Sequence, residues 1–113
     1  MAKKTGPKRT PRAVVVGTAS YGLYFGYTDA LDSEVVRDKA VRLTDARHVR
    51  YWYGKVGGIT SLAAHGPCGP KANDSRIGAR APSALITNVA NVYDCAEEAV
   101  AAFSKIEATD DGR

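Results

Sequence analysis

The sequence predicts an α+β domain with a small, mainly antiparallel sheet of about five strands, a short middle helix and a C-terminal helix packed on the sheet. Three observations predict it. Five short segments, 13–17, 21–28, 39–44, 47–53 and 85–93, are rich in β-branched or aromatic residues. The link between 39–44 and 47–53 is too short for anything but antiparallel neighbours. Apolar residues recur at helical spacing only near 59–65 and 96–106.

The first two strands are expected at 13–17 and 21–28. The run AVVVG is apolar and β-branched, which is typical of a strand covered on both faces. The run YGLYFGYT alternates, so Leu23, Phe25 and Tyr27 should share one face and Tyr24 the other. Gly22 and Gly26 then lie where another backbone can approach closely.

The next segment, 28–38, is acidic, and we expect it to be a long connection. Segments 39–44 and 47–53 are expected to form an antiparallel hairpin, because Asp45 in the link between them favours a turn. On one face of that hairpin Arg42, Arg50 and Trp52 come together.

A two-turn helix is expected over 59–65, ended by Gly66 and Pro67. The segment 66–82 is rich in glycine and proline and should be a loop of about seventeen residues. A strand at 85–93 follows. Asp94 precedes Glu97 by three, which is a capping-box pattern, and predicts a C-terminal helix. The apolar stripe of that helix, expected to lie across the sheet, consists of Ala96, Ala99, Val100, Phe103 and Ile106.

Charge divides the 113 residues into three parts, although the net charge is only +4. Residues 1–12 hold five cations and no acid, and we expect a flexible basic arm. Residues 13–106 should form a single domain, and residues 107–113 a flexible acidic tail. The cations of the arm, which are candidates for contacting nucleic acid, are Lys3, Lys4, Lys8, Arg9 and Arg12.

Several function classes lack support in the sequence. Cys68 and Cys95 do not make a disulfide framework, and no C-x-x-C pair suggests zinc. No apolar run has the length of a signal or of a membrane span, so we expect a cytoplasmic protein without membrane contact. No glycine-rich phosphate loop is present, and we expect neither a cofactor nor a metal.

Catalysis has few candidates. His48 and His65 are the only side chains that titrate near neutral pH. Cys68 lies three residues after His65, and an imidazole can activate a nearby thiol. One pair at that spacing does not define a catalytic site, and a histidine in either place is most often structural. We therefore expect a protein that is not an enzyme.

The sequence contains more residues suited to binding a ligand than residues suited to catalysis. Guanidinium groups bind phosphate bidentately, and an indole or phenol ring stacks on a base. The sequence thus predicts a phosphate-binding set of arginines and aromatic residues, consisting of Arg42, Arg47, Arg50, Trp52, Tyr53, Arg76 and Arg80. The alternative interpretation is that the aromatic residues belong to the core and the arginines to a solvated sheet face.

The run VRLTDARHVRYWYG followed by SLAAHG, within residues 41–66, resembles a family of short, uncharacterised phage and prophage proteins. Their shared core motif is T-[ND]-A-R-x-x-x-Y-W-x-G, and a looser similarity covers most of residues 13–106. The basic arm and the acidic segment 29–38 depart from the family pattern. The resemblance implies a viral origin and the fold, and it implies no activity.

The first hypothesis is a non-enzymatic, phage-encoded binding protein, a homo-oligomer acting in the cytoplasm of the host cell. It would hold a phosphate-bearing ligand such as a nucleotide, for example a host signalling nucleotide that it sequesters in an anti-defence role. The second hypothesis is a nucleic-acid-binding accessory protein that uses the basic arm. The third is a structural or partner-binding protein of the virion or of host takeover.

Overall fold

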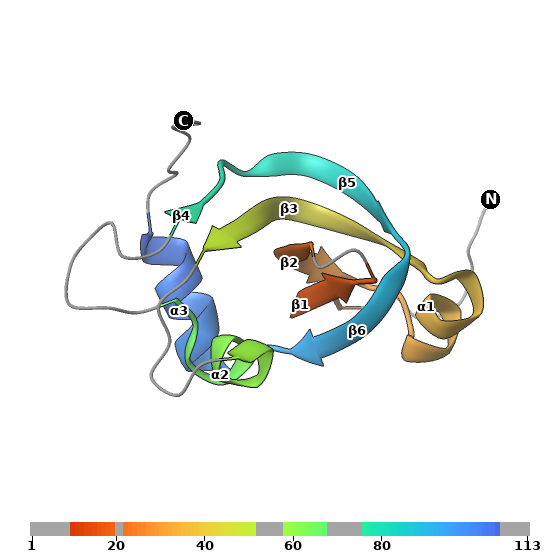
Figure 1. Cartoon of the computed structure of the whole chain (residues 1–113), viewed down its shortest axis with the longest axis horizontal. Coiled ribbons are helices and arrows are strands. Elements are labelled where there is room, and N and C mark those ends of the chain that lie inside the picture. The colour runs from red at the N-terminus through yellow and green to blue at the C-terminus, as the bar shows by residue number, and fades with distance from the viewer. Residues whose placement is uncertain (1–9, 20–21, 52–57, 68–75, 107–113) are drawn as a thin grey trace.

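The structure is a computed structural model, and it describes residues 10–19, 22–51, 58–67 and 76–106. The α+β prediction is confirmed, with an antiparallel sheet of five main strands and one two-residue strand, a short middle helix and a C-terminal helix (Figure 1). The elements in chain order are β1 (Arg12–Thr18), β2 (Leu23–Thr28), α1 (Asp32–Asp38), β3 (Ala40–Tyr51), α2 (Gly58–His65), a two-residue strand β4 (Arg76–Ile77), β5 (Ala81–Thr87), β6 (Val89–Asp94) and α3 (Glu97–Lys105).

The sheet is antiparallel and strongly curled. Its strands follow the order β4-β3-β2-β1-β6, and β5 also pairs with β3. Thr44 of β3 pairs with Tyr27 of β2 and with Ser83 of β5, so β2 and β5 lie on opposite edges of β3. The strands β5 and β6 therefore border opposite ends of the sheet, although only Asn88 separates them in sequence. The sheet curls around to make this link possible (Figure 1).

Two hydrophobic clusters lie on opposite sides of the sheet. The first cluster, which we call the inner core, includes Val14, Val16 and Leu43 together with Val35 of α1. The second, the outer core, includes Val15 and Phe25 together with Phe103 of α3. Successive residues of β1 thus enter different cores, which confirms that this strand is covered on both faces.

The predicted faces of β2 are also confirmed. Leu23, Phe25 and Tyr27 pack in or against the outer core, and Tyr24 packs against the inner core. The ring of Phe25 stacks on that of Phe103, with centroids 4.0 Å apart. The C-terminal helix therefore lies across the sheet, as its apolar stripe predicts.

The hairpin predicted over 39–53 is wrong, because its two halves are consecutive parts of the single strand β3. Asp45 has a positive φ of 50°, and the pairing with β2 shifts register between Phe25 and Tyr27. Gly26 lies at that shift, and a Cβ there would be 2.9 Å from the Cβ of Leu43. The link that resembles a turn is an extra residue inside a bent strand, which a neighbouring glycine accommodates.

Three other expectations differ from the structure. The acidic connection contains the helix α1, in which the N–H of Leu31 donates to Glu34 Oε1 at 2.9 Å. The strand expected over 85–93 is two strands, β5 and β6, divided at Asn88, whose φ is 56°. The segment expected to be a long loop contains β4 and the first residues of β5.

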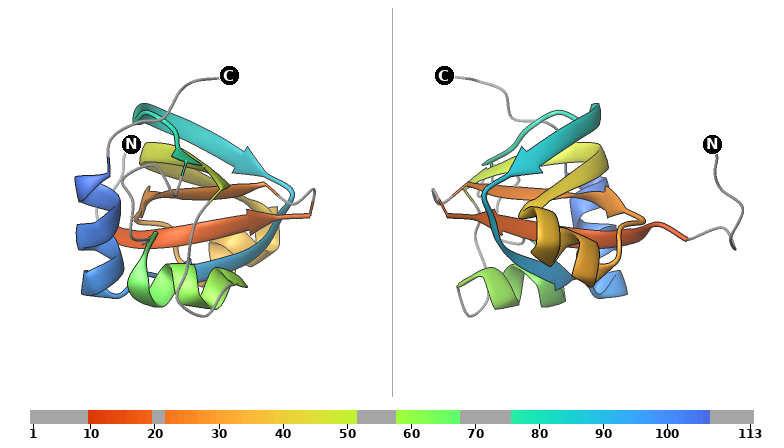
Figure 2. Two further views of the ribbon diagram at one scale, coloured as in Figure 1. Left: turned by 60° about the vertical axis from the view of Figure 1, so that its left-hand side comes forward. Right: turned by 90° about the vertical axis from the view of Figure 1, so that its right-hand side faces the viewer.

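The helices α2 and α3 lie close together (Figure 2) and pack against the outer core. They approach each other most closely at Gly66, which lies against Ala99 and Ala102 of α3. Gly66 ends α2 as predicted, with φ at 77°, and its N–H donates to the carbonyl of Leu62. The capping box expected at Asp94 is wrong, since α3 begins at Glu97 with Ala96 as its N-cap. None of the three helices in the described part of the chain has the length and apolar character of a membrane span.

Replacing Gly66 with alanine should destabilise the domain by about 2–4 kcal/mol, since it adds strain at a positive φ to a steric clash. A Cβ at this position would lie 2.7 Å from the Cβ of Ala102 and 3.0 Å from the carbonyl oxygen of Ala99. The control is Gly78→Ala, whose Cβ would meet nothing closer than 3.6 Å. Urea unfolding measures both, and equal stabilities would contradict the close packing of α2 on α3.

Candidate functional site

The structure divides the seven predicted ligand residues into groups with different environments. Trp52 and Tyr53 lie outside the described residues. Arg50 is described as part of the backbone of β3, and Arg76 as part of β4, where it pairs with Tyr51. The side chains that the structure describes are those of Arg42, Arg47 and Arg80.

Arg42 and Arg50 are not opposite each other, as the hairpin required. They lie on one strand, eight residues and roughly 26 Å of chain apart. The expected convergence of Arg42, Arg50 and Trp52 depended on the hairpin, so it loses its geometric basis.

Arg47 is a core residue, with only 1% of its surface exposed. Its Nε donates to the carbonyl oxygen of Gly78 at 2.8 Å, and its Nη1 donates to that of Phe103 at 2.7 Å. Burial, and secondarily the charge of Arg80, lower the pKa of Arg47. Phe103 belongs to the last turn of α3, whose carbonyls lack helical partners, so Arg47 caps that helix from the sheet. It is a structural residue in this fold and cannot meet a ligand in solvent.

Arg42 and Arg80 remain as exposed cations. Arg42 donates from Nη1 to Ser83 Oγ at 3.3 Å, across β3 and β5. Ser83 in turn lies directly opposite Thr44, which is also exposed. Arg80 immediately precedes β5 and is near enough to Arg47 to affect its pKa. The register places Arg42 opposite Leu85, five residues after Arg80, so the two arginines lie at different positions along β3 and β5. We call this stretch of surface, with Arg42, Thr44, Arg80 and Ser83, the basic patch.

The arginines of the basic patch differ from Arg12, which is half-buried, and from Arg37, which is exposed, because they have no carboxylate partner among the described residues. Arg12 donates to Asp32 at 2.6 Å and to Asp94 at 3.0 Å, and the hydrogen bond to Asp32 raises its pKa. Arg37 donates from Nε to Asp38 at 2.8 Å. Within the described residues, neither Arg42 nor Arg80 has such a partner, so both guanidinium groups remain available to an external anion.

Arg12 belongs to the folded domain, and this corrects the boundary expected after residue 12. It is the first residue of β1, and its Nη2 also donates to the carbonyl oxygen of Ala30 at 3.1 Å. Its contacts join β1 to the start of α1 and the end of β6. The other cations of the predicted arm, Lys3, Lys4, Lys8 and Arg9, lie outside the described residues.

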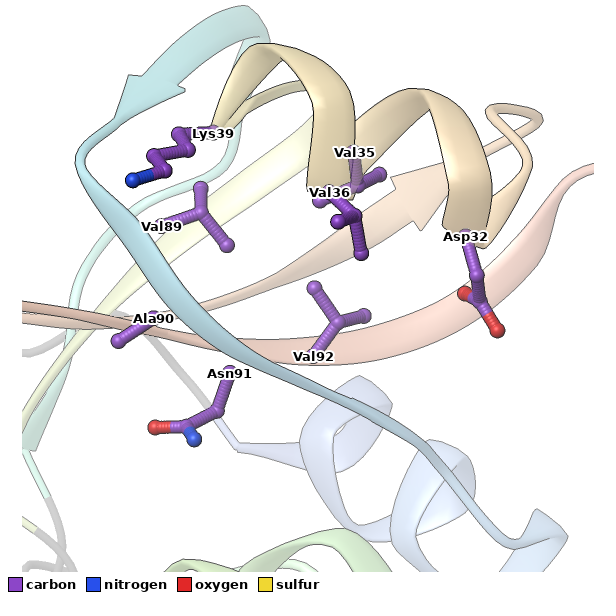
Figure 3. Close-up of a pocket in the computed structure, with 8 residues that line it drawn as sticks. All are labelled: Asp32, Val35, Val36, Lys39, Val89, Ala90, Asn91 and Val92. Carbon is purple, nitrogen blue, oxygen red and sulfur yellow. The ribbon is translucent and has the colours of Figure 1, made fainter.

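A groove of about 390 Å³ lies elsewhere, between α1 and β6 (Figure 3). Its lining is mainly apolar, and sequence reasoning missed it because α1 was expected to be a connection. The available signals were the acids Asp32 and Glu34 followed by Arg37, which match the polarity of a helix. The residues that line the groove are Asp32, Val35, Val36, Lys39, Val89, Ala90, Asn91 and Val92.

Of the candidate catalytic side chains, the structure describes His48 and His65, and these have different surroundings. His48 stacks on Tyr24 with ring centroids 5.0 Å apart, whereas His65 contacts Glu98 through Nδ1 at 3.2 Å. Cys68 lies outside the described residues. Cys95 is a free thiol against the outer core. Within the ranges that the structure describes, no three potential metal ligands are grouped together.

The family model described as Domain of unknown function (DUF6948) matches residues 11–103. No curated protein and no solved structure matches the chain.

Replacing Arg47 with methionine should lower the free energy of unfolding by about 2–4 kcal/mol, because the buried carbonyl of Phe103 and the partly buried carbonyl of Gly78 lose their donor. The control is Arg37→Met, which removes an equal charge from an exposed ion pair and should leave the stability close to that of the wild type. Chemical denaturation of the two variants measures the difference. A loss of stability at Arg37 equal to that at Arg47 would contradict the capping role.

Cys95 should react slowly with iodoacetamide at pH 8 in the folded protein. Burial, with a contribution from the charge of Asp94, raises the pKa of this thiol to about 12, so almost none of it is thiolate at that pH. Unfolding in urea lowers the pKa toward its ordinary value and should restore rapid alkylation. Peptide mass spectrometry follows Cys95 separately from Cys68, and rapid alkylation of Cys95 in the native state would contradict its burial.

Proposed function

The chain belongs to the DUF6948 family, whose description states no activity, and we propose from its own residues that it is a non-enzymatic binding protein for a phosphate-bearing ligand. The ligand contacts the basic patch on the outside of β3 and β5. The observation that carries this proposal is the pair of exposed guanidinium groups, Arg42 and Arg80, that lack a carboxylate partner among the described residues.

The chemistry of the patch suits a phosphate. A guanidinium group can donate two parallel hydrogen bonds to phosphate oxygens. These charge-assisted bonds are stronger than hydrogen bonds between neutral groups. The hydroxyls of Thr44 and Ser83, on paired strands beside Arg42, add further donors. Because the strands are rigid, these groups need little rearrangement to bind.

A small nucleotide is the first candidate ligand. Trp52 and Tyr53 follow β3 directly in sequence and carry rings that stack on bases. A signalling nucleotide of a host cell, sequestered by a phage-encoded protein, fits the resemblance of residues 41–66 to phage proteins.

Nucleic acid is the second candidate, favoured by the location of the patch. The basic patch lies on an exposed sheet surface and shares no residue with the groove beside α1. An open cationic surface suits a polymer whose phosphates stay partly hydrated. Lys3, Lys4, Lys8 and Arg9 would add to that contact.

Isothermal titration calorimetry with a panel of mono-, di- and cyclic nucleotides and with short single-stranded oligonucleotides tests the proposal. The double variant Arg42→Ala, Arg80→Ala should weaken binding at least about tenfold, since hydrogen bonds to charged groups contribute about 1.5–3 kcal/mol each. Arg37→Ala removes a cation from α1 and is the matched control. It should change the affinity less than about twofold.

Two further measurements distinguish a nucleotide from a nucleic acid as the ligand. Binding of oligonucleotides should fall steeply with salt and should weaken on deletion of residues 1–9, whereas neither change is expected for a nucleotide from the deletion alone. Native mass spectrometry reports a co-purifying anion. If no phosphate compound binds, or if the double variant binds as well as the wild type, the proposal is wrong and a structural or partner-binding role gains support.

A further inference from the structure

The sheet has two terminal edges within the described residues, and they differ in protection. One edge is formed by β5 together with the two-residue β4, which pair with successive parts of β3, and the other edge is formed by β6. The strand β5 contains Pro82, which has no N–H to offer a further strand. The strand β6 has the sequence VANVYD and contains neither proline nor lysine, the residues that commonly protect an exposed edge.

The register shows which backbone groups of β6 are available. The N–H of Cys95 donates to the carbonyl oxygen of Ala13, and Tyr93 pairs with Val15. Because hydrogen bonds alternate along an antiparallel strand, Tyr93 points its backbone groups toward β1, while Val92 and Asp94 point theirs away from it. The N–H of Val89 is already bonded to the carbonyl of Lys39, so the available part of the edge is its C-terminal half.

The groove runs along this same edge. Figure 3 shows Val36 of α1 and Val92 of β6 pointing toward each other across it. Val36 is 74% exposed, the largest value among the exposed large hydrophobic residues of the described chain. Apolar surface beside free strand groups is the combination that a further β-strand covers on docking.

The charges at the ends of the groove favour a second copy of the chain. The helix α1 runs antiparallel to β6. At one end Arg12 forms ion pairs with both Asp32 and Asp94, and at the other end the N–H of Val89 donates to the carbonyl oxygen of Lys39. Antiparallel pairing of β6 with β6 places a two-fold axis across the groove. That axis brings Lys39 of each copy to the end of the other copy's groove where Asp32 lies.

We propose that the chain forms a two-fold homodimer through β6. Val92 and Asp94 of one copy exchange backbone hydrogen bonds with β6 of the other, which extends the sheet across the interface. The Val36 side chains of the two copies close over the pairing, and Lys39 faces the partner's acidic end. This interface uses none of the residues of the basic patch, so the inference does not depend on the proposed function.

Sedimentation equilibrium and hydrogen exchange together test the dimer. The wild type should sediment as a dimer, and Val36→Lys should raise the dimer dissociation constant at least about tenfold, because it buries a charge in the apolar seam. Val36 is already exposed, so the variant should fold normally. The control is Leu85→Lys, a similar change at a 54% exposed residue of β5, and it should leave the dimer intact.

The amide protons give a pattern specific to this pairing. In the wild type, the amides of Val92 and Asp94 should exchange slowly, and in Val36→Lys they should exchange at least about tenfold faster, while Tyr93 stays protected by β1 in both. A wild type that stays monomeric, a Val36→Lys variant that stays dimeric, or a dimer with rapidly exchanging Val92 and Asp94 would overturn the proposal. A monomer protected there only by an added peptide of residues 88–95 would overturn it too and would assign the edge to foreign strands.

Discussion

The bend in β3 is the constraint on which the arrangement of the molecule depends. An extra residue at Asp45 changes the alternation of the strand, so Val41 and Leu43 enter the inner core whereas Val49 enters the outer core. Gly26 of β2 makes the bend possible, because a side chain there would collide with Leu43. One strand therefore serves two cores, and the sheet curls far enough for Asn88 alone to connect β5 and β6.

The burial of Arg47 follows from this bend. The extra residue turns Arg47 toward the outer core, beside Phe25, with which it pairs. A buried guanidinium needs acceptors, and it finds them in the carbonyl oxygens of Gly78 and Phe103. The same side chain thus holds together β3, the link between β4 and β5, and the last turn of α3. Arg42, on the other side of the bend, lies where α2 and α3 do not cover the sheet, and it stays in solvent.

The sequence predicts those features that depend on local pattern. A continuous apolar, β-branched run identifies β1, and period-two alternation identifies the two faces of β2. Helical spacing identifies the stripe of α3 that includes Ala99 and Phe103. Whether Asp45 makes a turn or an extra residue in a bent strand is not a local property. Both use a positive φ, and the choice depends on whether β2 or the following segment supplies the pairing.

The candidate site is predictable only in part, for the same reason. The sequence indicates an excess of arginine in the middle of the chain, and Arg42 and Arg80 do lie on an exposed surface. It does not indicate that the guanidinium group of Arg47 donates its hydrogen bonds to carbonyl oxygens 31 and 56 positions away. Nor does it indicate that Arg12 belongs to β1, because its partner Asp94 is 82 positions distant. The number of arginines alone overestimates how many side chains can contact a ligand. The hydrogen-bond and ion-pair partners of each guanidinium group decide which of them are available.

The basic patch and the dimer interface are compatible because they share no residue. Asn88 separates β5, which contributes to the basic patch, from β6, which contributes to the dimer interface. The basic patch involves the start of β5, and the dimer interface involves the end of β6, so pairing at β6 leaves the patches of both copies exposed. A dimer then offers two cationic surfaces to one ligand. A polymer long enough to reach both patches would gain avidity, whereas a mononucleotide would occupy each patch separately. Dimer formation at β6 would therefore strengthen the binding of nucleic acid much more than that of a nucleotide, which links the oligomeric state of the chain to the class of ligand it favours.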